Sequence, residues 1–209
     1  MGNKLRPAIF YVIAIFILIF AAPPANSDAA TPEAMVDSFH SDLLDVMKEG
    51  KKLGVKGRYE KLLNQIDTYF HMPLMVLFVT NEHWQTAPPE ARHALIGAAR
   101  RFGAGEMAVL FSDYAGESFK TNGTRRIQDK SVLVDTSLIQ PEGSPVKLIY
   151  RVRKFGDSWR IIDVLLDGSI SQLLKRRGEY RRVLAEEGLS GLTKLLNQKA
   201  DEMLADKTN

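Results

Sequence analysis

The pattern of hydrophobic and polar residues changes its period twice along the chain. From about residue 31 to residue 114, apolar residues recur every three or four positions, as on one face of a helix. After Gly116 they alternate with polar residues, as in half-buried strands, and from about residue 169 the helical spacing returns. The pattern predicts one α+β domain, in which an antiparallel curved sheet of three to four strands packs against N- and C-terminal helices.

The helices before the strands have recognisable ends. Thr31-Pro32-Glu33 is typical of a helix start, because threonine can cap the first turn and an early acid is favoured by the helix dipole. Gly50 predicts the end of that helix, and a loop between Gly54 and Gly57 is expected to precede a second one. The second and third helices are expected over about 58–70 and 73–80, and a longer one opens at Pro88-Pro89-Glu90.

Short turns separate the predicted strands. The alternation is clear over residues 132–139 and 146–153, and a largely apolar strand runs from Trp159 to Leu166. Proline and glycine residues at 141–145 and at Gly156-Asp157 mark the turns, and a weaker strand is expected between 117 and 127.

The chain returns to helix at its C-terminal end. Ser169 or Ser171 can cap a helix that runs to about Glu187, where Gly188 closes it. Ser190 can cap a final helix rich in leucine.

The first 27 residues have the layout of a secretory signal peptide. Lys4 and Arg6 precede an uninterrupted apolar run of 15 residues, Ala8 to Ala22, which Pro23-Pro24 breaks before the small residues Ala25-Asn26-Ser27. The alternative is an uncleaved anchor, but a spanning helix needs about 20 apolar residues. We therefore expect a signal peptide at 1–27 and a single exported domain at 28–209.

Composition excludes several classes of function. Without Lys4 and Arg6 the formal net charge falls from +3 to +1, so the broad basic face of a nucleic-acid-binding protein is not expected. The chain has no cysteine, which excludes catalytic thiols and cysteine-based metal sites.

No catalytic or metal site is predicted. None of the four histidines (His40, His71, His83 and His93) pairs with another at the helical spacing that metal ligands use. A serine follows Gly168, but the chain lacks the G-x-S-x-G nucleophile motif. We expect a protein that is not an enzyme and that uses no cofactor.

A basic run in the C-terminal helix has two interpretations. Lys175, Arg176, Arg177 and Arg181 lie close together, with Glu179 between them. They either form a solvated helix face or contact anionic headgroups or an acidic partner.

The apolar residues of the strands and long helix also have two interpretations. They either fill a core or line an apolar cavity between layers that do not close fully. The residues concerned are Phe102, Leu110, Tyr114, Val132, Val134, Leu138, Leu148, Tyr150, Val152 and Trp159.

The order of residues in the C-terminal half resembles a known family. Trp159 and Asp163-Val164 lead into Gly168-Ser169-Ile170-Ser171, and Arg177 follows, then Tyr180 and Gly188 before the last helix. This order resembles the MlaC, or toluene-tolerance, family of periplasmic phospholipid-binding proteins. The likeness extends upstream through Tyr150, Trp84 and Tyr69-Phe70.

Two departures from the main family pattern indicate a branch. Gly168 and Arg177 are one residue further apart than in the main pattern, and Ser169-Ile170-Ser171 replaces its G-V-S. Both features are more similar to the branch encoded in hopanoid gene clusters, HpnM.

The resemblance implies a carrier that moves a phospholipid or hopanoid between the inner and outer membranes and maintains the lipid asymmetry of the outer membrane. Its expected partners are an inner-membrane lipid transporter complex and an outer-membrane lipoprotein. The ten apolar residues above would then line the lipid cavity, and Lys175, Arg176, Arg177 and Arg181 would contact headgroups or partners. The alternative is a non-catalytic assembly accessory of a lipid-transport complex.

Overall fold

The computed structural model describes residues 31–128 and 130–205. The predicted signal peptide lies outside these residues. Within them, no helix combines the length and the apolar character needed to span a bilayer.

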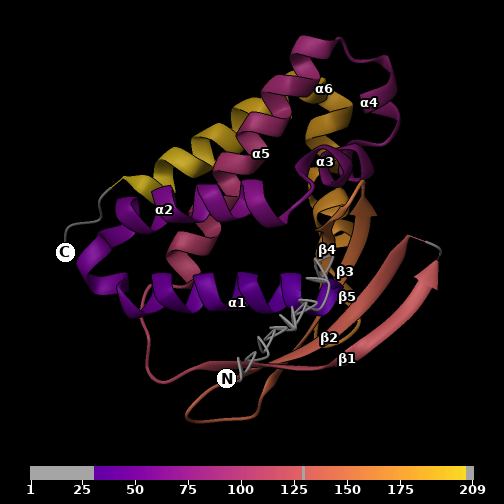
Figure 1. The fold of residues 1–209 in the computed structure, drawn as a ribbon. Helices are drawn as coiled ribbons and strands as arrows, with labels where there is room; N and C mark the ends of the chain where they lie inside the picture. Colours follow the sequence, from indigo (N-terminus) through magenta and orange to yellow (C-terminus); the bar gives the residue numbers. More distant parts are fainter. Residues whose placement is uncertain (1–30, 129, 206–209) are drawn as a thin grey trace, which may run out of the picture.

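Helices precede and follow the strands along the sequence, as the periodicity predicts (Figure 1). The N-terminal helices are α1 (Pro32–Lys48), α2 (Gly50–Tyr69), α3 (Met72–Thr80), α4 (Glu82–Thr86) and α5 (Pro89–Leu110). The strands are β1 (Ser118–Gln128), β2 (Ser131–Ile139), β3 (Val146–Phe155), β4 (Ser158–Leu166) and β5 (Ile170–Ser171), and α6 (Gln172–Leu204) follows.

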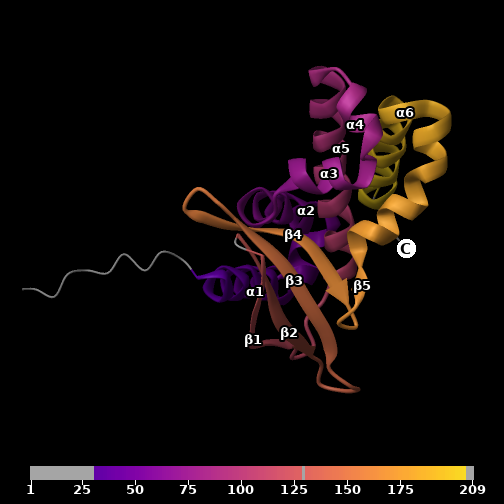
Figure 2. The same ribbon diagram turned by 90° about the vertical axis from the view of Figure 1, so that its right-hand side faces the viewer.

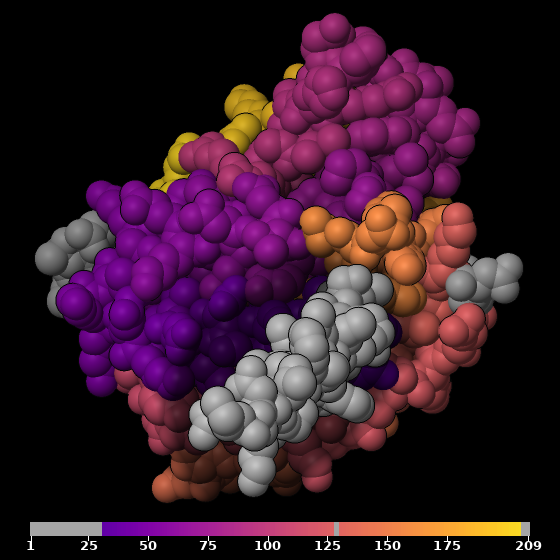
Figure 3. Space-filling view, in the orientation of Figure 1, coloured from indigo at the N-terminus to yellow at the C-terminus, as the bar shows by residue number. Residues whose placement is uncertain are grey.

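The sheet is an antiparallel meander. Its strands lie in the order β1-β2-β3-β4-β5, with Val134 of β2 opposite Tyr150 of β3. The strands curve around α1 in Figure 1, and in the space-filling view of Figure 3 they lie below and to the right of the N-terminal helices, in salmon to orange. The predicted α+β class and curved antiparallel sheet are confirmed. The short strand β5 was not predicted, because two residues carry no detectable alternation.

The described residues form two separate hydrophobic cores. The sheet core joins one face of β2, β3 and β4 to α1 and α2, and it includes Val36, Leu62 and Val134. The helical core joins α3, α5 and α6 and includes Leu95, Leu184 and Leu192. Figure 2 shows the helices of the second core standing beside the sheet, away from α1.

Three local features differ from the sequence predictions. Gly57 lies inside α2, and the expected loop shrinks to a kink at Gly54, where φ is 61° and ψ is 179°. The helix α4 was not predicted. Gly188 has φ 63° and ψ −157° and turns α6 sharply, so the two predicted helices follow one another without a loop (Figure 2).

Asp163 fixes the junction between the sheet and α6. Its buried carboxylate accepts hydrogen bonds from the Ser171 hydroxyl at 2.6 Å and from the backbone N–H groups of Val164 at 2.9 Å and Leu173 at 3.2 Å. Ser171 in turn caps α6 by accepting from Leu174 N–H at 3.1 Å. A carboxylate with several N–H donors at a helix N-terminus is strongly stabilised. The Asp-Val and Gly-Ser-Ile-Ser segments therefore hold the start of α6 in place.

His40 lies in the sheet core. Its Nε2 lies 3.0 Å from the Tyr150 hydroxyl, and its ring stacks on Phe119 with centroids 3.9 Å apart. Burial lowers the pKa of His40 to about 4 and raises that of Tyr150. Both groups are therefore neutral at pH 7, and this histidine serves the core.

Stability is expected to fall as the pH falls from 6.5 to 4 because of His40. Below about pH 6.5 the unfolded chain binds a proton that the folded chain excludes until about pH 4. The wild type therefore loses about 3 kcal/mol over this range from this group alone. Urea unfolding at pH 7 and pH 4.5 checks this against His40→Gln, whose stability is expected to fall less over the same range. Equal losses in both proteins would contradict the assignment.

A candidate binding cavity with two chambers

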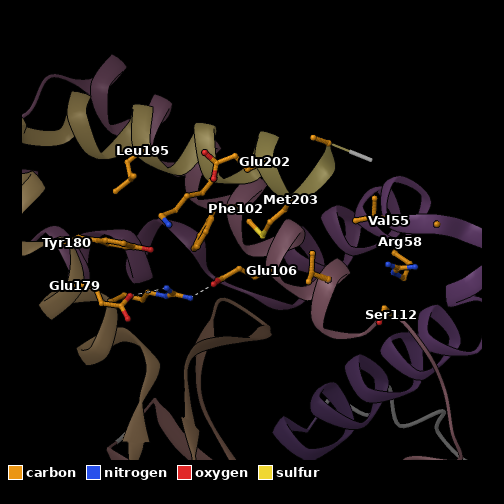
Figure 4. Close-up of a pocket in the computed structure, with 15 residues that line it drawn as sticks. Val55, Arg58, Phe102, Glu106, Ser112, Glu179, Tyr180, Leu195, Glu202 and Met203 are labelled. Atoms are coloured by element: carbon orange, nitrogen blue, oxygen red, sulfur yellow. Dashed lines mark hydrogen bonds and ion pairs between the residues drawn. The ribbon is translucent and has the colours of Figure 1, made fainter. Parts of the chain in front are cut away.

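The larger of two adjoining cavities, here called the outer chamber, opens between α2, α5 and α6. It has a volume of about 1320 Å³. Its lining mixes apolar and charged side chains, with Val55 from α2, Phe102 and Val109 from α5, and Leu195 and Met203 from α6 (Figure 4). This lining suits a ligand that is partly apolar and partly polar.

The smaller cavity, here called the inner chamber, is lined mainly by apolar residues, with charged side chains at one side only. It has a volume of about 140 Å³ and lies between α3, α5 and α6. Val76 of α3, Leu95 and Ala99 of α5, and Leu173 and Leu192 of α6 form its walls. The apolar part of this lining favours a hydrocarbon group.

Four residues line both chambers and mark their boundary: Phe102 and Glu106 from α5, and Arg176 and Tyr180 from α6. Arg176 donates hydrogen bonds to Glu106 and, at 2.9 Å, to Glu179. Its guanidinium carbon lies 5.2 Å from the centre of the Phe102 ring. The dashed lines in Figure 4 show this bridge between the helices.

At the boundary between the chambers, Arg176 is charged and Tyr180 is neutral. Burial opposes the charge of Arg176, but Tyr180, Glu106 and Glu179 raise its pKa above the usual value. Burial also raises the pKa of Tyr180 to about 12, so its hydroxyl remains protonated. A ligand that spans both chambers therefore passes an ion pair, a phenol and an aromatic ring.

Arg58 brings a buried positive charge to the wall of the outer chamber. Its side chain donates from Nε to the Ala108 carbonyl at 2.8 Å and from Nη1 to the Gly50 carbonyl at 2.6 Å. Burial lowers the pKa of this guanidinium. Its carbonyl partners join the start of α2 to the end of α5, which fixes the wall.

The ten residues predicted to bind ligand are divided between different environments. Phe102 is the one among them that lines the two chambers. Val132, Val134, Tyr150 and Val152 are buried in the sheet core, and Leu148 and Trp159 pack against it. Leu138 is half-buried, whereas Tyr114 and Leu110 are exposed. Their roles in binding stay predictions.

The basic residues of α6 also lie in different environments. Arg176 faces the chamber boundary, whereas Lys175 is exposed and lies 3.9 Å from Glu179. The Arg177 guanidinium lies 5.9 Å from the Phe78 ring, and Arg181 is exposed. The structure therefore assigns these neighbours to two different surfaces.

Several residues of the chamber walls were missed at the sequence level. Glu106, Ala99 and Met203 belong to ordinary helical stretches and carry no motif. One signal was present, because Gly105 packs against Met203: a Cβ at this glycine would lie 3.2 Å from the Met203 methyl carbon. A glycine inside a helix often marks such a close approach between helices.

The chambers contain no arrangement suited to metal chemistry. Across residues 31–128 and 130–205, no group of three His, Cys, Asp or Glu side chains is placed to hold a metal ion. The charged groups at the boundary are paired with one another instead. The arrangement fits binding of an amphiphile.

Comparisons with known proteins found a matching family model and solved structures of similar fold. The family model described as MlaC protein matches residues 37–198. A search of curated proteins found no match. Among solved structures, the fold is similar to the phospholipid-binding protein from Ralstonia solanacearum in complex with a phospholipid, with a TM-score of 0.70 and 19% sequence identity over 82% of this chain and 97% of that one.

Proposed function

The chain belongs to the MlaC family, and from this premise we propose that it is a periplasmic carrier of a membrane lipid. Its cargo is a phospholipid or a hopanoid, which it moves between the inner and outer membranes. The protein binds lipid and catalyses no reaction.

The observation that carries this proposal is the two-chamber cavity. Exposing one acyl chain of about sixteen methylenes to water costs roughly 13 kcal/mol, so a carrier must enclose the chain. The inner chamber offers an apolar site for a chain end, and the outer chamber, with Arg58 and the Arg176–Glu106 pair, suits glycerol and headgroup atoms. Its volume of about 1320 Å³ exceeds the roughly 300–1,000 Å³ usual for pockets that hold drug-sized ligands.

The phospholipid and the hopanoid alternatives for the cargo are supported by different observations. The solved protein of similar fold is described as a phospholipid-binding protein in complex with a phospholipid, which supports a phospholipid for this chain as well. The hopanoid alternative is supported by the longer spacing from Gly168 to Arg177 and by the Ser169-Ile170-Ser171 variant.

The place of action and the partners follow from the same proposal. The signal-like residues 1–27 support export to the periplasm. The carrier would receive or deliver lipid at an inner-membrane transporter complex and at an outer-membrane lipoprotein. The alternative is an assembly accessory of that complex, for which a lipid-sized cavity has no use.

Native mass spectrometry of the protein purified from periplasm tests the proposal. We expect one lipid mass bound to each chain, with a mature N-terminus near Asp28. The cavity volume and its apolar inner end favour a single lipid molecule. Extraction with organic solvent then identifies the lipid class. A spectrum of ligand-free protein, with no lipid in the extract, would favour the assembly accessory.

A further inference from the structure

The helix α3 exposes apolar side chains to solvent. Its nine residues include no charged side chain. Val76 and Val79 are buried in the helical core, but Leu77 and Phe78 on the outer side are 41% and 37% exposed. A helix that is apolar all round is normally covered on all sides by protein or by lipid.

The exposed apolar surface continues onto the next elements. Leu174 of α6 is 59% exposed, Ile170 of β5 is 51% exposed, and Leu166, which pairs with Ile170, is 37% exposed. Figure 2 shows α3 above the junction of β5 and α6, and these helices pack together. The apolar patch consists of Leu77, Phe78, Leu166, Ile170 and Leu174.

Positive charges border the apolar patch. Arg177 and Arg181 follow Leu174 on one face of α6, and the Arg177 guanidinium lies over the Phe78 ring. Lys147 packs beside Gly168, between β4 and β5. Between residues 166 and 181 the acids are Asp167 and Glu179, and Glu179 is held by Arg176 at 2.9 Å. The border is therefore predominantly cationic.

The same two helices form the wall of the inner chamber. Val76 and Val79 of α3 and Leu173 of α6 line it from within, while Phe78 and Leu174 face outward. A surface bound through Phe78 and Leu174 would lie one helix thickness from the apolar chamber. This position suits a lipid surface better than a soluble partner.

We propose that the apolar patch docks on the surface of an anionic lipid bilayer. Leu77, Phe78 and Leu174 enter the boundary between headgroups and acyl chains, and Arg177 and Arg181 contact lipid phosphates. Apolar insertion and cationic attraction together are the requirements for binding at a membrane interface. This surface goes beyond the carrier function, since it binds a bilayer whether or not the chambers hold lipid.

Cosedimentation with vesicles tests the docking surface. The mature protein is mixed with vesicles of phosphatidylglycerol and phosphatidylcholine, or of phosphatidylcholine alone. We expect stronger binding to the anionic vesicles. Replacing Arg177 and Arg181 with glutamine should weaken that binding about fivefold for each arginine, which corresponds to about 1 kcal/mol each. Replacing Phe78 and Leu174 with serine should weaken binding by at least about tenfold.

Matched control variants test whether the loss of vesicle binding is specific to the apolar patch and its arginines. Ile127→Ser removes an exposed isoleucine of β1, and Arg126→Gln removes an exposed arginine of the same strand. Both should bind vesicles like the wild type. The proposal would be overturned if the patch variants bound vesicles as strongly as the wild type. It would also be overturned if every protein bound both vesicle types equally, or if none of them bound vesicles. Copurified lipid is measured separately, so failure of the carrier function and failure of docking give different results.

Discussion

Replacing Ala99 with leucine is expected to weaken the affinity of the protein for its lipid by at least about tenfold while leaving the fold intact. Ala99 is half-buried on α5 and lines the inner chamber of about 140 Å³. A leucine there occupies space that a chain end would use. Excluding two methylenes from the chamber costs about 1.6 kcal/mol, or more than tenfold in affinity.

The fold should tolerate this substitution, because the added carbons fill a void. Cavity filling usually raises the free energy of unfolding by about 0.5–2 kcal/mol. The measurements are the share of bound lipid that is lost to excess vesicles at equilibrium, and urea unfolding of the same preparation. Ala94→Leu is the control, since Ala94 is exposed on the same helix. Undiminished lipid in Ala99→Leu would show that the inner chamber does not hold the ligand.

Replacing Val134 with aspartate is expected to destabilise the protein by at least about 4 kcal/mol, because it buries an unpaired carboxylate. Val134 has no exposed surface and packs in the sheet core against α1 and α2. Urea unfolding, or the yield of soluble protein if the variant does not fold, measures the effect. Val134→Ala removes volume without adding charge and should cost about 2 kcal/mol while keeping the bound lipid.

This variant also decides the role of the sheet face. The sequence allowed Val132, Val134, Tyr150 and Val152 to line either a core or a cavity. If Val134→Asp remains folded and loses only its lipid, the sheet face is part of the binding site. Unfolding, with lipid retained in Val134→Ala, assigns this face to the core.

Local chemistry explains why the elements could be predicted. The Thr31 hydroxyl accepts from Ala34 N–H at 3.1 Å, and Ser171 caps α6 in the same way. The alternation in the sequence of β3 reflects side chains that point to opposite faces of the sheet, whereas residues 131–134 of β2 are buried on both faces. These signals depend only on neighbouring residues. The misplaced loop at Gly57 shows their limit, since glycine permits a break and does not require one.

The candidate site was only partly predictable for a different reason. Phe102 and Arg176 were identified, but their partners Glu106 and Tyr180 were not assigned to a site. Arg176 meets Glu106 across 70 residues of sequence. No local pattern distinguishes Arg176, which faces the chambers, from Arg177, which faces outward.

The sequence by itself determined the order of the main helices and strands, the cap at Thr31, and the family, because each depends on residues close together in the chain or on their linear order. Only the tertiary structure decided which apolar faces fill a core and which enclose a cavity. A side chain buried against protein and one buried against a ligand have the same pattern, since both are withdrawn from water. The difference depends on how closely the elements pack. The helices α3, α5 and α6 leave space between them, whereas the sheet and α1 close on one another, and contacts between distant segments of the chain set this packing.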